Sequence, residues 1–153
     1  MATTISIEQT LSKAIRSIPI SGSELLRFYD LVRHYLRELD ASRDEEHNKR
    51  LVGRLLEQLF YEGKNAVNSA NPIDLAIFAN AVAKNSRPVV LFEVKQPTNA
   101  EMVRRVNLNR KALHELVLYY VREELISHNT DITHLIITDG VQWFVFDKRV
   151  FYD

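Results

Sequence analysis

This chain of 153 residues contains no cysteine, and it also lacks a long apolar run and a signal-peptide pattern. Without cysteine the chain has no disulfides and no thiolate metal sites. This composition fits a reducing compartment, and we expect a cytoplasmic protein. No apolar run approaches the ~18–20 residues that a membrane-spanning helix needs, and the first ten residues lack a signal-peptide pattern. We therefore expect no membrane partner.

A surplus of charge of one sign is also lacking, because 20 Lys and Arg residues balance 20 Asp and Glu residues. A free-standing DNA-binding protein usually carries a basic surplus, so the balance counts mildly against that class. It counts less against a catalytic domain whose DNA affinity comes from other regions of a longer protein. The remaining composition, 46% hydrophobic and 26% charged, is ordinary for one globular domain with a continuous core.

Apolar residues at helical spacing dominate the first 61 residues. They predict helices over residues 6–18, from Ser23 to about residue 39, and from about residue 44 to residue 61. Ser23 is the expected N-cap of the second helix, and Ser42 or Asp44 that of the third. We divide the chain into an N-terminal helical segment, residues 1–41, packed on a core of residues 42–153.

The period then changes to that of strands, with one more helix between them. The predicted strands are residues 66–69, 74–80, 89–96, 132–138 and 142–147. The predicted helix covers residues 102–127, with an irregularity around Asn107 and Asn109. Asp139-Gly140 between the last two strands favours a hairpin. If the helix is a crossover, strand 132–138 lies parallel to strand 89–96. The expected fold is α/β (α+β), a mixed central sheet of about five strands flanked by helices.

Two charged side chains, Glu93 and Lys95, end an otherwise apolar run that begins at Pro88. They share one face of the predicted strand, because side chains alternate with a period of two. Asp74 begins the preceding strand. Two carboxylates and a lysine on adjacent strands form a site for a hard divalent cation and for phosphodiester hydrolysis. The plainer alternative is a surface ion pair at a strand end, which contributes little energy.

The order of elements, together with Asp74 and the Glu93-Val94-Lys95 strand end, resembles the PD-(D/E)XK nuclease superfamily over about residues 44–147. The stretches 93–99, 107–120 and 134–146 look closer to the N-terminal nuclease region of bifunctional type II (type IIG-like) restriction–modification enzymes. In those proteins an adenine-specific DNA methyltransferase and a target-recognition region follow on the same chain. The resemblance implies a restriction-endonuclease-like fold and a Mg²⁺-dependent endonuclease acting on double-stranded DNA. Since the chain stops directly after a strand, we expect a fragment of a longer polypeptide.

The resemblance also implies roles for individual residues. Asp74, Glu93 and Lys95 take the catalytic positions, and the carbonyl of Val94 joins the two carboxylates as a ligand of Mg²⁺, for which Mn²⁺ is an alternative. The early-helix glutamate of the superfamily, which is the fourth catalytic residue, best matches Glu46. The remaining matches are the alternatives for that glutamate, Glu45 and Glu57, and the accessory positions Gln96, Glu115 and Tyr119. Glu115 stands where the superfamily often has glutamine, and the Pro-Asp start of the first catalytic strand is here Pro72-Ile73-Asp74.

A polar and basic stretch follows the lysine strand and could contact DNA phosphates. It comprises Arg104, Arg105, Asn107, Asn109, Arg110 and Lys111. The alternative for these residues is a solvated helix face. For the whole chain, two alternatives to the nuclease remain open. One is a catalytically degenerate nuclease-fold module that positions DNA or supports a fused methyltransferase, and the other is an α/β binding domain without nuclease ancestry.

Overall fold

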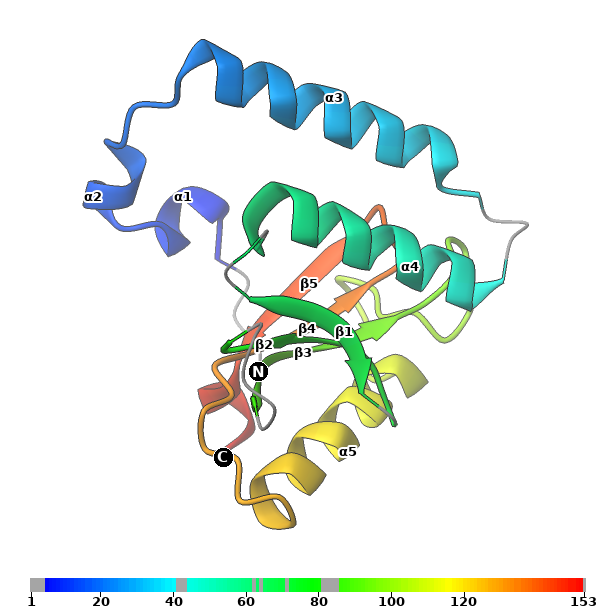
Figure 1. Cartoon of the computed structure of the whole chain (residues 1–153). Coiled ribbons are helices and arrows are strands. Elements are labelled where there is room, and N and C mark those ends of the chain that lie inside the picture. The colour runs from blue at the N-terminus through cyan, green and yellow to red at the C-terminus, as the bar shows by residue number, and fades with distance from the viewer. Residues whose placement is uncertain are drawn as a thin grey trace.

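A five-stranded mixed sheet organises the chain in the computed structural model, which describes residues 5–40, 44–61, 63, 65–70, 72–80 and 86–152 (Figure 1). The strands are β1 (Ala66–Ala70), β2 (Ile73–Phe78), β3 (Pro88–Val94), β4 (His134–Thr138) and β5 (Trp143–Asp147), and they lie side by side in this order. β1, β2 and β3 are antiparallel, β3 and β4 are parallel, and β4 and β5 are antiparallel. The predicted fold class is therefore confirmed.

Both predicted connections of the last strands are confirmed. Helix α5 (Lys111–Leu125) is the crossover that brings β4 parallel to β3, and β4 and β5 form a hairpin. The Asp139 side chain shapes the hairpin turn, because it accepts hydrogen bonds from the backbone N–H groups of Val141 (2.9 Å) and Gln142 (2.7 Å). This is the local side-chain bonding that makes Asp a turn residue.

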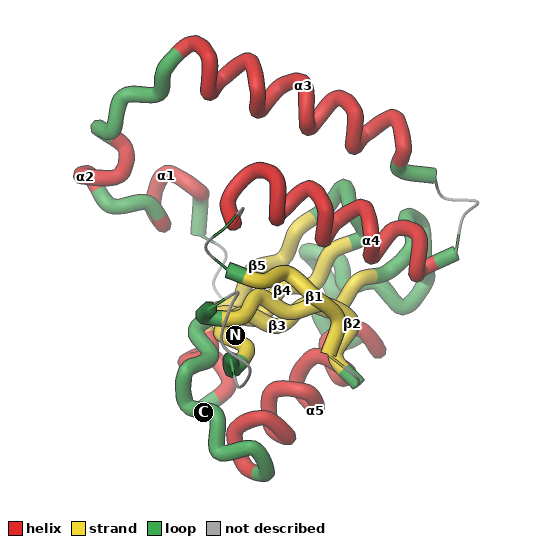
Figure 2. Tube along the Cα trace, viewed as in Figure 1, coloured by secondary structure: helices red, strands yellow, loops and turns green. Residues whose placement is uncertain are grey.

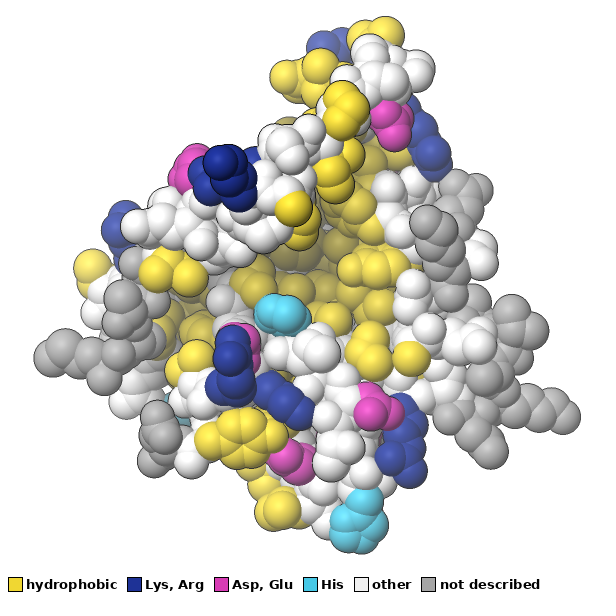
Figure 3. Space-filling model, turned by 90° about the vertical axis from the view of Figure 1, so that its left-hand side faces the viewer, with side chains coloured by type: hydrophobic (Ala, Val, Ile, Leu, Met, Phe, Trp, Pro, Cys, Tyr) yellow, Lys and Arg dark blue, Asp and Glu magenta, His cyan; other side chains and the backbone are white. Residues whose placement is uncertain are grey.

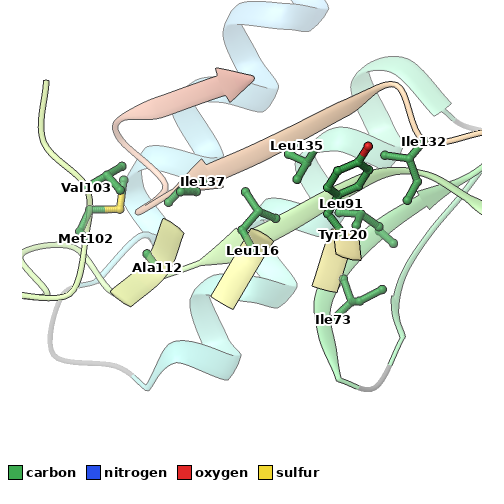
Figure 4. Close-up of a cluster of buried hydrophobic side chains, with 11 residues drawn as sticks. Ile73, Leu91, Met102, Val103, Ala112, Leu116, Tyr120, Ile132, Leu135 and Ile137 are labelled. Carbon is green, nitrogen blue, oxygen red and sulfur yellow. The ribbon is translucent and has the colours of Figure 1, made fainter. Parts of the chain in front are cut away.

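The sheet is covered by α4 (Glu45–Leu56) on one face and by α5 on the other (Figure 2). Asp44 caps α4 by accepting a hydrogen bond from His47 N, as predicted, and a π-helical turn (Glu57–Tyr61) extends the helix. Alternation along β3 sends Phe92 and Val94 toward the α4 side and Leu91 toward the α5 side. Figure 4 shows the cluster on the α5 side, where Leu116 packs with apolar residues of three strands.

Three helices precede the core: α1 (Ile7–Thr10), α2 (Lys13–Arg16) and α3 (Gly22–Glu38), of which α3 lies over α4 (Figure 1). The single helix predicted over residues 6–18 is wrong, because the chain is interrupted at residues 11–12, where Ser12 caps α2. The cap of α3 is Ser21 rather than Ser23. Ser21 forms a capping box with Glu24, which satisfies two backbone donors at once.

The helix predicted from residue 102 begins nine residues later, at Lys111. Residues 102–110 form a loop instead. Arg104 and Asn107 exchange two backbone hydrogen bonds of 2.9 and 2.8 Å, and the Asn107 side chain accepts from the backbone of Asn109. Such local bonding competes with a helix. The predicted boundary at residues 41–42 lies outside the described residues.

None of the described helices has the length and apolar character required to cross a membrane.

Tyr35 ties α3 to the β4–β5 turn. Its buried hydroxyl donates a 2.8 Å hydrogen bond to the carbonyl of Gly140. Gly140 has φ +87°, a left-handed conformation that favours glycine. A Cβ at this position would come within 2.6 Å of the Tyr35 hydroxyl and 2.8 Å of a methyl group of Leu39.

Gly140→Ala should therefore lower the free energy of unfolding by about 2 kcal/mol or more, because it adds both backbone strain and overpacking. Gly22→Ala is the matched control. A Cβ at Gly22, in the first turn of α3, meets nothing within 4 Å, and the change should raise stability by about 0.5–1 kcal/mol. Urea denaturation measures both, and equal stability of the two variants would contradict this account of the turn.

Candidate active site

An ion pair lies buried at the carboxyl end of β3. Glu93 is 1% exposed and Lys95 is 5% exposed, and 2.5 Å separates Lys95 Nζ from Glu93 Oε1. The second carboxylate oxygen, Glu93 Oε2, is buried without a hydrogen-bond partner among the described residues. Burying charged groups is costly unless they are paired. Pairing with Lys95 therefore offsets part of the cost of burying the Glu93 carboxylate at this strand end.

Asp74 joins this pair from the neighbouring strand. The antiparallel register pairs Leu75 with Phe92, and one residue further it sets Asp74 beside Glu93. Asp74 Oδ2 accepts a 3.0 Å hydrogen bond from the backbone N–H of Val94. The structure thus brings together Asp74, Glu93 and Lys95, which are three of the four residues predicted to be catalytic; the fourth is Glu46.

The helices on both sides of the sheet add carboxylates around Lys95. Its Nζ lies 3.0 Å from Glu115 on α5, 3.8 Å from Glu45 at the start of α4, and 3.9 Å from Glu101 in the loop before α5. Lys111 pairs with Glu101 at 3.0 Å and with Glu115 at 3.5 Å. Carboxylates outnumber ammonium groups in this set of described residues, so the net charge of the site is negative.

The three candidates for the early-helix glutamate lie in different places. Glu45 faces Lys95, whereas Glu46 is mostly exposed and forms an ion pair with Lys49. Lys49 in turn lies 3.0 Å from Asp74. Glu57 is exposed at the end of α4. Successive residues on a helix point about 100° apart, so Glu45 and Glu46 cannot both turn toward the sheet.

Burial and neighbouring charge shift the ionisation of this group of residues. Burial, together with the charge of Asp74, raises the pKa of Glu93 to about 8. Burial lowers the pKa of Lys95, but hydrogen bonds to Glu93 and Glu115 and the charges of Glu93 and Glu45 outweigh it, so the pKa of Lys95 is raised. Burial and the charges of Glu93 and Asp74 raise the pKa of Tyr119 to about 12. Tyr119 therefore lies within electrostatic reach of the site, one turn after Glu115 on α5.

The residues predicted to contact DNA lie mostly in the loop before α5. Arg104, Arg105, Asn107 and Asn109 are exposed there. The Asn109 side chain lies 2.7 Å from the His114 ring, and Arg110 is the half-buried residue that precedes α5. Lys111 is exposed but pairs with two glutamates. Gln96 is half-buried directly after Lys95, and its carbonyl accepts a hydrogen bond from Asn99 N.

Sequence reasoning missed two members of the site, Lys49 and Glu101. The signal for Lys49 was its place four residues after Glu45, which puts both on one face of α4. Glu101 carried no such signal, because it reaches Lys95 and Lys111 only through the path of the loop.

The family model described as "Domain of unknown function (DUF7149)" matches residues 5–153. The chain belongs to this family. Comparison with curated proteins and with solved structures gives no match. The family description names no activity.

The donor set of the site fits a hard cation. Asp74 and Glu93 offer carboxylate oxygens, and Val94 lies between Glu93 and Lys95 on the same strand end. Within the described ranges, no group of three or more His, Asp or Glu side chains is arranged to hold a metal ion. Mg²⁺ needs fewer, because it commonly binds one or two carboxylates and keeps several waters.

The raised pKa of Glu93 predicts a pH-dependent stability. A carboxyl group whose folded pKa lies above its unfolded value of 4.5 favours the folded state below 4.5, and this contribution is lost as the pH rises toward about 8. Glu93→Gln cannot ionise, so its stability relative to wild type should increase steadily between pH 5 and pH 8.

Urea midpoints of both proteins at four pH values measure this effect. Glu115→Gln is the control of opposite sign, because hydrogen bonding and charge from Lys95 outweigh burial and lower the pKa of Glu115. Its loss of stability relative to wild type should shrink as the pH falls below 4.5. A difference between Glu93→Gln and wild type that stays constant with pH would count against a raised pKa at Glu93.

Proposed function

We propose that this chain is a Mg²⁺-dependent DNA endonuclease domain that hydrolyses phosphodiester bonds, as in type II restriction–modification enzymes. One observation carries the proposal. Glu93 is buried beside Asp74 and Lys95 with one oxygen unpartnered among the described residues, although burial of such a group lowers stability. Strongly perturbed carboxylates held in this way are typical of functional sites.

Each residue has a distinct role in the proposed reaction. Asp74 and Glu93, with the carbonyl of Val94, would hold the ion, which when bound supplies an activated water and neutralises charge on the scissile phosphate. Lys95 would orient the attacking water or stabilise charge that develops on the phosphate. Glu115, at 3.0 Å, holds the Lys95 ammonium in place. Fixing the ammonium in advance reduces the reorganisation that the reaction requires.

A specific observation also favours a second function, the catalytically degenerate module that positions DNA or supports a methyltransferase. Lys49 already pairs with Asp74, and Lys95 already pairs with Glu93. The two central carboxylates are therefore compensated by lysines, and a site of this kind can persist for structural reasons. A measurement of cation binding distinguishes the two functions. In the nuclease, Asp74 and Glu93 must bind a metal ion in place of their lysine partners, whereas the degenerate module has no such requirement.

The partners follow from the same proposal. The substrate is double-stranded DNA, and a fused adenine-specific methyltransferase with its target-recognition region would supply sequence specificity. The formal charge of zero supports this division of labour, since sequence-independent DNA affinity depends on a surplus of Lys and Arg. A cytoplasmic location agrees with the absence of cysteine.

Calorimetric titration with Mn²⁺ should show one bound ion in wild type and none in Asp74→Asn, because the amide cannot replace the charge of the carboxylate. Asp147→Asn is the matched control. Asp147 pairs with Arg149 at the end of β5 that lies opposite His134, away from the Glu93 end of the sheet. Equal binding by wild type and Asp74→Asn would exclude the proposed ligand set, and no binding by wild type would favour the degenerate module.

The isolated chain should bind duplex DNA weakly and with a strong dependence on salt. Lys111 is already engaged by Glu101 and Glu115, so Arg104 and Arg105 in the exposed loop are the main phosphate contacts we expect. Fluorescence anisotropy of a labelled duplex, measured from low to physiological salt, tests this. Arg104→Gln with Arg105→Gln should remove the remaining affinity. Tight, sequence-selective binding by this chain alone would contradict the proposed division of labour.

A further inference from the structure

Among the described residues two asparagines are buried, and they differ in their hydrogen bonding. Asn129, which is 1% exposed, is fully engaged: its amide donates to the carbonyl of Pro88 (2.9 Å) and to Glu123 (3.2 Å), and its oxygen accepts from Asp131 N. Asn48, which is 0% exposed, has no hydrogen-bond partner among the described residues for either its amide nitrogen or its oxygen. Each such orphaned group in a native fold needs an explanation.

The position of Asn48 on α4 points to the candidate active site. It follows Glu45 by three residues and precedes Lys49 by one, and these two neighbours reach Lys95 and Asp74. Residues three apart on a helix share a face, and helical side chains lean toward the N-terminus of their helix. These rules place the Asn48 side chain over the first turn of α4, which contains Glu45 and adjoins the site.

Glu45 is itself loosely held. Its contact with Lys95 is 3.8 Å long, which is beyond hydrogen-bond distance. The Glu45 carboxylate, which is not hydrogen-bonded to Lys95, and the Asn48 amide, which has no partner among the described residues, thus belong to residues one helical turn apart. An apolar residue shaped like asparagine would suit the same core position at least as well, beside Leu51 and Val52. Packing alone does not account for an amide at position 48.

We propose that Asn48 is a positioning residue of this site, whose amide binds the Glu45 carboxylate, directly or through one water molecule, when the site holds a divalent cation. The inference rests on the proposed function and extends it to a buried residue outside the predicted catalytic set. Partners of this kind fix the orientation of groups around a metal and commonly change its affinity by ~10–100-fold.

The test compares Mn²⁺ affinity with stability in two matched variants, Asn48→Leu and Asn129→Leu, in the intact chain. Asn48→Leu should weaken Mn²⁺ binding roughly 10-fold while its urea midpoint stays the same or rises, because no bond within the described residues is lost. Asn129→Leu should lower the urea midpoint, because three hydrogen bonds are lost, and leave Mn²⁺ affinity unchanged. Glu45→Gln and the double variant Glu45→Gln/Asn48→Leu complete a cycle in which the two effects should not add.

Three outcomes would overturn the inference, and they are distinguishable from one another. If wild type binds Mn²⁺ and Asn48→Leu binds it equally well, Asn48 has a purely structural role and the proposed function stands. If the effects of Glu45→Gln and Asn48→Leu add fully, Asn48 does not act through Glu45. If wild type binds no Mn²⁺, the proposed function fails and the inference fails with it. Should Asn48→Leu not fold, Asn48→Ala takes its place with the same expected loss of affinity.

Discussion

The buried pair of Glu93 and Lys95 is the constraint on which the rest of the site depends. Burying two charged groups is costly, and their mutual attraction offsets part of that cost. Burial, together with the charge of the neighbouring Asp74, raises the pKa of Glu93 although Lys95 lowers it. The carboxylates of Glu45 and Glu115 lie near the Lys95 ammonium from opposite sides of the sheet. The first turns of α4 and α5 therefore lie at the same strand end.

This strand end belongs to β3 and β4, the parallel pair of strands among the described residues. β3 and β4 run in the same direction, so their carboxyl ends lie side by side. There the backbone N–H of Lys95 donates a 2.8 Å hydrogen bond to the carbonyl of the buried Thr138. Polar groups commonly gather at the carboxyl ends of parallel strands. The apolar clusters on both faces of the sheet hold α4 and α5 rigidly enough to position charged side chains there.

The N-terminal helices are less well buried than α4 and α5. In α3 the side chains of Leu25, Tyr29 and Leu36 are about half exposed, and Figure 3 shows apolar side chains around a hollow on that side of the molecule.

The strands and their grouping could be predicted from the sequence because they follow from local pattern. A period of two put Glu93 and Lys95 on one face, and the crossover and hairpin rules gave the order of the last three strands. The rotation of α4 could not be predicted in the same way. Whether Glu45 or Glu46 faces the sheet depends on how the helix docks, and both lie in the first turn of the predicted helix, so its local pattern does not decide between them. The start of α5 was missed for a similar reason, since Met102 and Val103 are buried as a helix would bury them but belong to a loop.

Membership of the DUF7149 family leaves the chemistry of the site as the decisive question. Anomalous diffraction from crystals grown with MnCl₂ addresses it most directly, because manganese is located by its own signal. The nuclease proposal predicts a single strong peak between the carboxylates of Asp74 and Glu93, with Lys95 Nζ displaced from Glu93 Oε1 and Lys49 displaced from Asp74. Crystals that show no peak there at millimolar MnCl₂, with both lysine–carboxylate pairs intact, would contradict it.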